Sequence, residues 1–348
     1  MSEAPAEYAV SVVILNYNAK QWAHRCIESL TQQTIFDRIQ IIIADNASAD
    51  GSDKLFEELI SGWKNAIFVQ NGGNIGFAAG NNRGAHRASG RYLFFLNPDL
   101  WLEPDCVEQL YRTAEENKVA AAGPYVMDYD DDAYQSFGAV GFDVCSLGVP
   151  VKPGHTPREL FMTVGFVFIR RDVFERLGSF NEQFFLYGEE SDLSWKIWIS
   201  GERLIPGPKG RVHHRGAVSV NPKGGTQMVE IRTSDLKRSQ SNLNNVLVLL
   251  YHAQHILLLL LFPLLLLLLV ESLMGMVLAR RWSFLRATYL GVLLQLWRLR
   301  SHIAERRRFV HSLRRRGDFW MLRFFTWRLA HWEDFKRVLK LGLPKINK

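Results

Sequence analysis

Polar side chains follow apolar runs in the first hundred residues, at positions where they could do chemistry. Segment 71–82 (NGGNIGFAAGNN) is rich in glycine and asparagine, and the apolar run 92–96 ends at Asn97, Pro98 and Asp99. Glycine lets a backbone approach a bulky polar ligand, because it has no Cβ and tolerates positive φ. A carboxylate at the carboxyl end of a buried strand lies where open α/β sheets bind ligands. The two segments together predict an enzyme that handles a nucleotide-linked substrate.

The elements that must position these residues alternate between strands and helices. Strands are predicted at 10–15, 39–44, 66–70 and 92–96, and helices at 21–33, 54–60, 80–88 and 103–117. This alternation is typical of βαβ units around a parallel sheet, so the predicted fold class is α/β. The carboxyl ends of such strands share one edge, which would bring together the polar clusters at 16–18, 45–50, 71–81 and 97–99.

Carboxylates and histidines follow further along the chain. A strand is predicted at 161–169, helices at 172–177 and 191–200, and a long loop at 127–157, which shows no periodicity. Glu189 and Glu190 stand just before the last helix, where the helix dipole favours negative charge, and a carboxylate there suits a general base. His213 and His214 come next, and a neutral histidine is a common metal ligand. The alternatives are an ordinary acidic first turn and two packing histidines.

The earlier residues also have plainer interpretations. Asp45 can accept the imide N–H of a uracil or thymine base, whereas Ser48 and Ser52 can simply cap the next helix. Asp99 can be a hard oxygen ligand for a metal ion that also binds a diphosphate, or only a β-turn residue. Segment 71–82 can contact a diphosphate or sugar, or only form turns. Its GNNRG sequence does not fit the phosphate loop of ATP-cleaving enzymes.

Charge is distributed unevenly along the chain. The 348 residues carry a net charge of +7. Residues 280–348 hold 14 Arg and 4 Lys against 2 Asp and 2 Glu, a net charge of +14, which leaves −7 on the first 279 residues. A basic tail on an acidic domain is expected to meet an anionic surface. Trp, Phe and Leu interleave with the arginines after an apolar run, which favours anionic membrane lipid as the partner and argues against nucleic acid.

Cysteine usage and the N-terminus indicate a cytoplasmic catalytic domain. The three cysteines, Cys26, Cys106 and Cys145, have no paired spacing, which fits a reducing compartment and gives no support to a zinc site. Residues 1–9 have neither a basic region nor an apolar core, so no signal peptide is predicted.

The apolar run predicts a membrane-inserted segment. Residues 256–270 (ILLLLLFPLLLLLLV) carry no charge, and the stretch to residue 279 is long enough for one crossing. One crossing would place the basic tail on the far side, against the positive-inside rule. We therefore predict a catalytic domain at 1–245, a re-entrant or half-inserted element at 246–279 that breaks near Pro263, and basic, Trp-rich amphipathic helices on the headgroups at 280–348. The alternative is a two-pass hairpin that uses 284–297. The tryptophans at a suitable interfacial depth would be Trp282, Trp297, Trp320, Trp327 and Trp332.

Six segments, taken in order, resemble the family-2 inverting glycosyltransferases, in particular the bacterial rhamnosyltransferase-like subgroup. They are SVVILNYN (11–18), IIIADNASADGS (41–52), NIGFAAGNNRG (74–84), LFFLNPD (93–99), GSFNEQFFLYGEESDL (178–193) and HRGAVS (214–219). The resemblance covers roughly residues 10–220. It rests on the presence of all six segments in the family's order, because each segment alone is weak evidence. It implies a GT-A fold with a Rossmann-like, mostly parallel sheet, a nucleotide-sugar donor, Mn²⁺ or Mg²⁺, and inversion at the anomeric carbon.

The resemblance also implies roles for single residues. Asp45 would contact the base, Asp99 would be the carboxylate of a DxD-like metal motif, and His214 would be a late metal or phosphate contact. Glu190 would be the catalytic base, with Glu189 as the alternative. Asn97 and Glu190 each stand where many relatives have Asp. The remaining predicted donor-binding residues lie at the ends of strands: Asn16, Tyr17, Asn18, Asn46, Asn74, Gly76, Asn81 and Asn97.

The predicted reaction is metal-dependent, inverting transfer of L-rhamnose from dTDP-rhamnose, or of another hexose from a UDP-sugar. The acceptor would be a polyprenyl-diphosphate-linked saccharide of the cell envelope, used at the cytoplasmic face of the bacterial inner membrane. Two other classes stay open. A sugar nucleotidyltransferase is expected to carry a glycine-rich basic loop after the first strand, where this chain has Asn16 to Ala19. An inactive membrane-bound scaffold that only binds nucleotide sugar would have no need for both Asp99 and a carboxylate pair.

Overall fold

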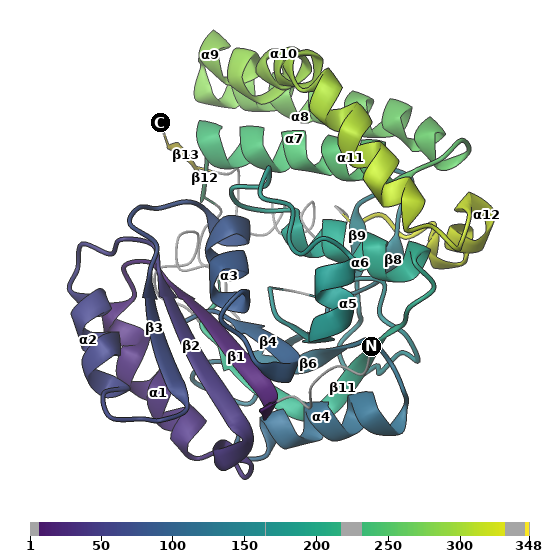
Figure 1. Cartoon of the computed structure of the whole chain (residues 1–348). Coiled ribbons are helices and arrows are strands. Elements are labelled where there is room, and N and C mark those ends of the chain that lie inside the picture. The colour runs from purple at the N-terminus through teal and green to yellow at the C-terminus, as the bar shows by residue number, and fades with distance from the viewer. Residues whose placement is uncertain (1–6, 164, 217–231, 331–344, 348) are drawn as a thin grey trace.

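The computed structural model describes residues 7–163, 165–216, 232–330 and 345–347. Its N-terminal part alternates strands and helices as the sequence predicts (Figure 1). The strands are β1 (Tyr8–Asn16), β2 (Ile39–Asp45), β3 (Ala66–Gln70) and β4 (Gly90–Leu96). The helices are α1 (Ala23–Thr31), α2 (Ser52–Leu59), α3 (Phe77–Ala85) and α4 (Cys106–Glu116), with short 3₁₀ turns at Lys20–Trp22 and Phe36–Arg38. All four predicted strands and all four predicted helices of this part are confirmed, with ends shifted by a few residues.

The sheet is mixed and not simply parallel. Its strand order is β3-β2-β1-β4-β10-β6-β11-β5, with β7 paired to β6. Strands β1 to β4 pair in parallel, as do β6 and β11, but β10 lies antiparallel between β4 and β6, and β5 lies antiparallel to β11. The added strands are β5 (Leu100–Leu102), β6 (Ala121–Asp128), β7 (Tyr134–Ser136), β10 (Val167–Arg170) and β11 (Leu204–His214).

Two sequence predictions in this region were wrong in part. The predicted loop at 127–157 contains the end of β6, all of β7, and a separate hairpin of β8 (Ala139–Phe142) and β9 (Gly148–Pro150). The predicted strand at 161–169 is a strand only from Val167 onward. β6 and β11 were not predicted at all. Both contain Gly and Pro, and β11 also carries Lys209 and Arg211, so their strand conformation depends on pairing inside the sheet and not on local propensity.

Apolar residues on both faces of the central strands explain their unbroken apolar runs. Val13, Leu93 and Phe95 belong to the hydrophobic cluster on one face, together with α3 and the C-terminal helices. Val12, Ile14 and Phe94 belong to the cluster on the other face, together with α1, α2 and α4. Because successive strand residues point to opposite faces, a strand covered on both sides is expected to be apolar at most positions.

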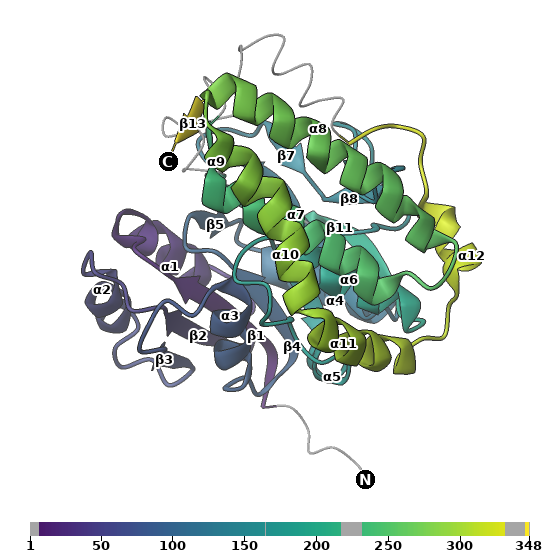
Figure 2. The same ribbon diagram turned by 90° about the horizontal axis from the view of Figure 1, so that it is seen from above.

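Helices after β10 build a second layer over one face of the sheet (Figures 1 and 2). The first are α5 (Arg171–Arg176), α6 (Glu189–Ile199) and α7 (Asp235–His252). Then come the 3₁₀ helix η3 (Leu257–Leu260), α8 (Leu261–Ala279), α9 (Trp282–Leu285), the π-helical turn η4 (Arg286–Leu290), α10 (Gly291–Arg298), α11 (Arg300–Ser312), α12 (Asp318–Met321) and the 3₁₀ helix η5 (Leu322–Phe324). Strands β12 (Arg232–Ser234) and β13 (Lys345–Asn347) pair in parallel.

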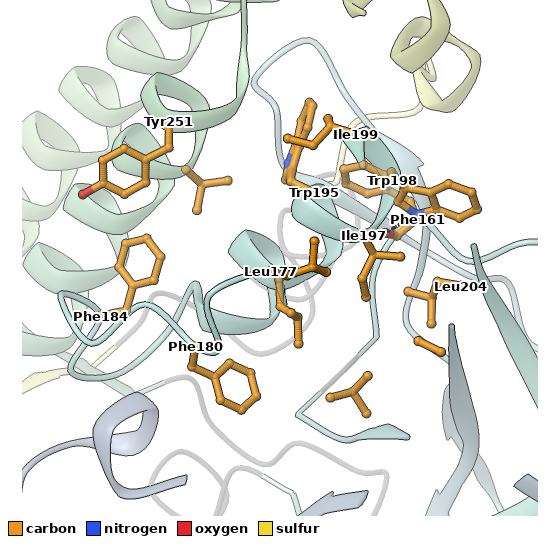
Figure 3. Packing of buried hydrophobic residues seen from close by; sticks show 14 of the residues in the cluster. Phe161, Leu177, Phe180, Phe184, Trp195, Ile197, Trp198, Ile199, Leu204 and Tyr251 are labelled. Carbon is orange, nitrogen blue, oxygen red and sulfur yellow. Dashed lines mark hydrogen bonds between the residues drawn. The ribbon is translucent and has the colours of Figure 1, made fainter. Parts of the chain in front are cut away.

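One hydrophobic core joins this helical layer to the sheet. Trp195 and Trp198 of α6 and Tyr251 of α7 are fully buried and pack in the interior shown in Figure 3. The same cluster includes Val13 in β1 and Val310 in α11. Residue 245, the predicted end of the catalytic domain, falls inside α7, a helix whose second half is buried in this core. The C-terminal helices are therefore part of the same folded unit as the sheet.

The apolar run forms one long helical segment. By length and composition, one helix in the described ranges could cross a membrane, Leu257–Leu278, with a mean hydropathy of 2.7. The helical path changes from 3₁₀ to α at Leu261, two residues before Pro263. Pro263 thus lies in the first turn of α8, where its missing N–H costs no helical hydrogen bond.

Arginines of the C-terminal region bind the carboxyl ends of α6 and α7. The guanidinium of Arg316 donates hydrogen bonds to the carbonyl oxygens of Trp198, Gly201 and Glu202 at the end of α6. Arg307 and Arg314 donate to carbonyl oxygens at the end of α7. The last carbonyls of a helix lack intrahelical partners and carry partial negative charge, so cationic donors stabilise them. Part of the basic charge of the tail is therefore used inside the protein.

Candidate active site

The carboxyl ends of the first strands meet at one edge of the sheet. Asn16 at the end of β1 lies opposite Asp45 at the end of β2, and Asp45 lies opposite Gln70 at the end of β3. Ile14 lies opposite Leu96, which places the Asn97–Asp99 segment on the same side. The predicted convergence of polar clusters at this edge is confirmed.

Asp45 is fully buried, and four protein groups donate hydrogen bonds to its carboxylate. Its carboxylate accepts from the side chains of Asn16 (2.6 Å), Gln70 (2.9 Å) and Ser48 (2.6 Å), and from the Ser48 backbone N–H (3.0 Å). Such a network fixes the turn after β2, because its donors come from three separate stretches of backbone, at Asn16, Ser48 and Gln70. In this conformation Asp45 shapes the wall of the site.

The turn after β1 presents the exposed members of the predicted donor pocket. Tyr17 is 49% exposed, and Asn18 is exposed with a positive φ of 53°. Asn18 is nevertheless fixed, because its backbone N–H donates to Ser48 Oγ (3.0 Å) and its side-chain oxygen accepts from the Ala49 N–H (2.8 Å). The two turns thus form one polar rim, with Tyr17 free to lie against a planar group.

The glycine-rich segment is fastened to the loop that leads into α6. The Phe77 N–H donates to the Phe185 carbonyl oxygen (2.7 Å), and a Cβ added to Gly76 would lie 2.7 Å from that same oxygen. Asn82 donates to the Phe180 carbonyl (2.9 Å) and accepts from the Phe180 N–H (3.1 Å). Glycine is therefore required at 76 by a close backbone approach, but the approaching backbone belongs to the protein itself.

The predicted asparagines in and near this segment differ in exposure. Asn46 is buried and donates to the Gly76 carbonyl (3.1 Å) and to Asn74 Oδ1 (3.3 Å). Asn81 is fully buried and donates to the Phe77 carbonyl (3.0 Å). Asn74 is exposed and Asn97 partly so. The structure thus leaves Asn74 and Asn97 open to a ligand, whereas Asn46 and Asn81 support the loop from inside.

Asp99 and His214, 115 positions apart in the chain, lie side by side. His214 Nε2 is 3.5 Å from Asp99 Oδ2, and the two side chains are 18% and 19% exposed. The antiparallel pairing of β5 with β11 produces this approach, because it sets His214 opposite Leu100. His213 points elsewhere: its ring is buried, stacks on Trp101 and bonds to the Asp128 carbonyl and to Glu103.

The donor set at Asp99 and His214 fits a divalent cation. Two ligands of one six-coordinate Mg²⁺ or Mn²⁺ ion in neighbouring positions lie about 3 Å apart, close to the spacing seen here. Partial exposure leaves room for phosphate oxygens and water. No group of three or more His, Cys, Asp or Glu side chains among the described residues could hold a metal ion, so a cation here would take its other ligands from substrate and solvent.

The two adjacent glutamates at the start of α6 have different surroundings. Glu189 is 2% exposed, and burial, followed by the charge of Glu190, raises its pKa well above the usual range. Glu190 keeps partial exposure. Burial raises the pKa of Glu190 as well, while hydrogen bonds from its own backbone N–H and from that of Gly165 oppose the rise. Glu190 is therefore the carboxylate that a substrate can reach.

Two consecutive residues connect this carboxylate to the Asp99–His214 pair. Gly165 donates its backbone N–H to Glu190, and the ring of Phe166 packs edge-on against His214, with centroids 4.8 Å apart. A hydroxyl donor or a phosphate bound between the two groups would thus meet a carboxylate on one side and a cation site on the other.

Several supporting residues were not predicted from the sequence. Asp192 and Lys196, one turn apart in α6, form a fully buried ion pair of 2.8 Å, and Lys196 also donates to the Ser179 carbonyl (2.6 Å). His252 of α7 lies 3.5 Å from Asp192. Asn244 of α7 donates to the carbonyls of Leu186 (3.0 Å) and Tyr187 (2.6 Å), just before the glutamates. The i, i+4 spacing of Asp192 and Lys196 was visible in the sequence, but their burial was not.

Comparison with known proteins gives a family match. Residues 11–178 match the model of glycosyl transferase family 2. EpsH of Bacillus subtilis, a proposed glycosyltransferase, is 36% identical over 123 residues, which are 35% of this chain and 35% of EpsH. The minor teichoic acid biosynthesis protein GgaB of the same organism is 32% identical over 119 residues, 34% of this chain and 13% of GgaB. The O-antigen biosynthesis protein RfbC of Myxococcus xanthus is 26% identical over 243 residues, 62% of this chain and 19% of RfbC. The chain thus spans about a third of EpsH and under a fifth of the other two.

The fold also has a solved counterpart. A crystal structure of GalNAc-T7 with UDP, GalNAc and Mn²⁺ superimposes with a TM-score of 0.65 at 17% sequence identity, and covers 98% of this chain and 59% of that one. At this identity the match concerns the arrangement of the sheet and its helices.

Proposed function

We propose that the protein transfers a sugar, with inversion at the anomeric carbon, from a nucleotide sugar to an acceptor hydroxyl, because residues 11–178 match the model of glycosyl transferase family 2 and the fold resembles that of GalNAc-T7. The observation that carries the proposal is the approach of Asp99 to His214 at the edge where β1, β2 and β4 end, with the partly exposed Glu190 linked to this pair through Gly165 and Phe166. A cation site beside a carboxylate is what this reaction requires.

Glu190 is the proposed base. It takes the proton of the acceptor hydroxyl while that oxygen forms a bond to the anomeric carbon, and the bond from that carbon to the diphosphate breaks on the opposite face. The electron pair leaves with the diphosphate. A carboxylate with a raised pKa is a stronger base than a free one, which suits proton removal near neutral pH. Glu189 is buried and its pKa is raised well above the usual range, mainly by that burial, so it is the second candidate for the base.

Asp99 and His214 would hold the divalent cation, Mn²⁺ or Mg²⁺, with the donor diphosphate completing its shell. When bound, such a cation supplies positive charge that stabilises the leaving diphosphate. The exposed ring of Tyr17 and the polar side chains of Asn18, Asn74 and Asn97 would line the nucleotide and sugar. The donor we propose is dTDP-L-rhamnose, or failing that a UDP-sugar, on the resemblance of the Asn97-Pro98-Asp99 segment to rhamnosyltransferase-like enzymes.

The proposed acceptor is a polyprenyl-diphosphate-linked saccharide of the cell envelope, at the cytoplasmic face of the bacterial plasma membrane. Two observations support it. The relatives GgaB and RfbC carry names from teichoic acid and O-antigen synthesis. The helix Leu257–Leu278 is long, apolar and little buried, as expected for a protein that works at a lipid surface.

A donor screen tests the proposal. Purified protein would be offered dTDP-rhamnose and a set of UDP-sugars, with and without a polyprenyl-linked acceptor, while nucleoside diphosphate release is measured. The wild type is expected to release nucleoside diphosphate with one donor. EDTA should abolish this release, and added Mn²⁺ or Mg²⁺ should restore it. Asp99→Ala should show no release. Full activity in EDTA would remove the cation from the mechanism. If no donor gives nucleoside diphosphate release, the result would favour a protein that only binds nucleotide sugar.

A further inference from the structure

Helix α8 carries a row of large apolar side chains on its outer face, whereas its two polar side chains, Glu271 and Ser272, face the protein. Its outward side chains are large and apolar, and exposed between 39% and 76%: Phe262, Leu266, Val270, Leu273, Met274 and Val277. Its inner face carries Ser272, which accepts a hydrogen bond from Thr288 (2.8 Å), and Glu271, which pairs with Arg238 of α7 at 3.5 Å. A helix facing water buries its apolar stripe and exposes its polar one.

The neighbouring segment of η4 and α10 shows a second outward apolar stripe. Leu290, Leu293, Leu294 and Trp297 recur at helical spacing and are exposed between 38% and 63%. Exposed arginines stand at the borders of both stripes: Arg280 after α8, Arg286 before Leu290, and Arg298 and Arg300 after Trp297. Trp282, 76% exposed, lies at the turn between the two helices. α8, α9 and α10 lie on one side of the molecule, beyond α7 as seen from the sheet (Figures 1 and 2).

Both ends of the long helical segment are tied to the globular part. At its start, the Leu257 N–H donates to the buried carboxylate of Asp318 (3.0 Å). Just after its end, Arg281 pairs with Asp235 at the start of α7 (2.7 Å). Between the ends, Leu264, Leu268, Ser272 and Gly275 are buried along one face. The segment of 22 residues is about 33 Å long.

We propose that α8 and the η4–α10 segment form a lipid-docking surface. This surface lies flat in the headgroup and upper acyl region of one leaflet of an anionic bilayer, with α8 in the membrane plane. This deepens the membrane location given under the proposed function. The outward stripes enter the acyl region, the tryptophan lies at the headgroups, and the bordering arginines meet lipid phosphate.

The anchoring of both ends excludes a crossing helix. If α8 crossed the bilayer, its two ends would lie on opposite sides of about 30 Å of hydrocarbon. Asp318, Asp235 and Arg238 would have to follow into or across that layer, with α7 and its buried asparagines attached. Burying such groups in hydrocarbon costs far more than insertion of the apolar stripe returns.

Charge at the borders favours lipid over a second copy of the chain. A symmetric dimer through these stripes would bring like-charged arginines of two copies together, whereas phosphate headgroups neutralise them.

The first test is flotation of the full-length protein with vesicles after detergent removal. Vesicles with a third anionic phosphatidylglycerol are expected to carry the protein to the top of the gradient. Phe262→Asp and Val277→Asp replace outward side chains, so they should keep the fold and weaken binding about tenfold or more. Ser61→Asp adds the same charge at an exposed position after α2, and should float like the wild type. Equal flotation of all variants would overturn the proposal, as would a lipid-free dimer in which the outward residues are protected.

The second test measures depth. Single cysteines at 262, 266, 270, 274 and 277 would carry an environment-sensitive fluorophore, quenched by lipids brominated at known depths; the native cysteines are buried. For a helix in the plane, all five positions report one shallow depth. A depth that rises toward 270 and falls on both sides would mean a crossing helix, and would refute the in-plane placement. Nucleotide-sugar turnover by the same variants in detergent reports on the catalytic proposal separately, because it needs no vesicle.

Discussion

At the start of α6 two neighbouring glutamates differ in their contact with solvent. Glu189 is 2% exposed, whereas Glu190 is partly exposed and accepts a hydrogen bond from the Gly165 N–H. Their motif could be recognised in the sequence, and so could the candidates Asp99 and His214. The sequence could not decide between the two glutamates. That choice depends on Gly165, which contacts Glu190 from 25 residues earlier in the chain.

Replacing each glutamate in turn should show whether Glu190 is the base. Glu190→Gln keeps the size of the side chain but cannot accept a proton, so kcat should fall about 10²-fold or more while donor KM changes little. Glu189→Gln is expected to retain most activity, since the buried Glu189 side chain is only 2% exposed and is not open to substrate. Because burial raises the pKa of Glu190, the acid limb of the wild-type rate profile should lie above the pH at which a free glutamate titrates. The reverse ranking of the two variants would reassign the base to Glu189.

His252 should make stability depend on pH. Burial, opposed by the charge of Asp192, lowers the pKa of His252 from 6.5 to about 4. The folded state therefore excludes a proton that the unfolded chain binds below pH 6.5, so stability is complete above that pH and falls as pH drops toward 4. The difference corresponds to about 3 kcal/mol at 1.36 kcal/mol per pKa unit. Denaturant titrations between pH 7 and 4 measure it.

His252→Gln should flatten this dependence between pH 6.5 and 4. His24→Gln, at an exposed position in α1, is the matched control and should leave the slope as it is. A wild-type slope in the His252 variant would mean that other groups cause the acid sensitivity.

At the scale of elements, α3 holds the loop that leads into α6, although about a hundred residues separate the two helices. Asn82 and the Gly76–Phe77 turn hold the loop that ends at the glutamates, and Asn244 of α7 holds it from the other side. The strands that could be predicted, β1 to β4, consist mostly of apolar residues, with polar residues few and largely near their ends. β6 and β11 could not be predicted, because Gly and Pro in a strand are tolerated only through pairing that the local sequence does not record.

Gly76→Ala should act as a positioning change. The new Cβ would collide with the Phe185 carbonyl at 2.7 Å, in a backbone conformation with φ of +90° that alanine rarely adopts. A shift of the loop by about 1 Å would move Glu190, so kcat should fall by about 10²-fold with a smaller change in donor KM.

Gly73→Ala is the matched control for this change. It lies in the same loop, and its added Cβ would meet nothing within 4 Å, so it should keep wild-type kcat. Equal kinetics of the two variants would show that the contact with Phe185 does not position the base.

At the scale of the whole molecule, the C-terminal helices share one hydrophobic core with the sheet. The sequence suggested a separate basic tail, since charge and hydropathy change sharply near residue 245. Composition could not reveal that three arginines of this tail bind the ends of α6 and α7, because their partners are backbone carbonyls, which every sequence contains.

Removing Arg316 should destabilise the C-terminal end of α6. Arg316→Ala loses three hydrogen bonds to carbonyls at the end of α6, and the stacking of the guanidinium over Trp320 at 4.0 Å. We expect a loss of about 3 kcal/mol in the free energy of unfolding. Arg315→Ala, one residue earlier and exposed, should change it by less than about 0.5 kcal/mol. Similar thermal unfolding curves for both variants would contradict this function of the tail.

The distance in sequence between Asp99 and His214 has a consequence for synthesis on the ribosome. At about 5–20 residues per second, the chain that carries His214 leaves the ribosome on the order of ten seconds after Asp99. During that interval β4 has no β10 beside it, since β10 begins only at Val167, and an open strand edge invites pairing with other chains. The nascent N-terminal half should therefore bind chaperones until α6 and β11 emerge. Crosslinking of chains stalled near residue 150 or near residue 300 checks this, and equal chaperone contact at both lengths would count against it.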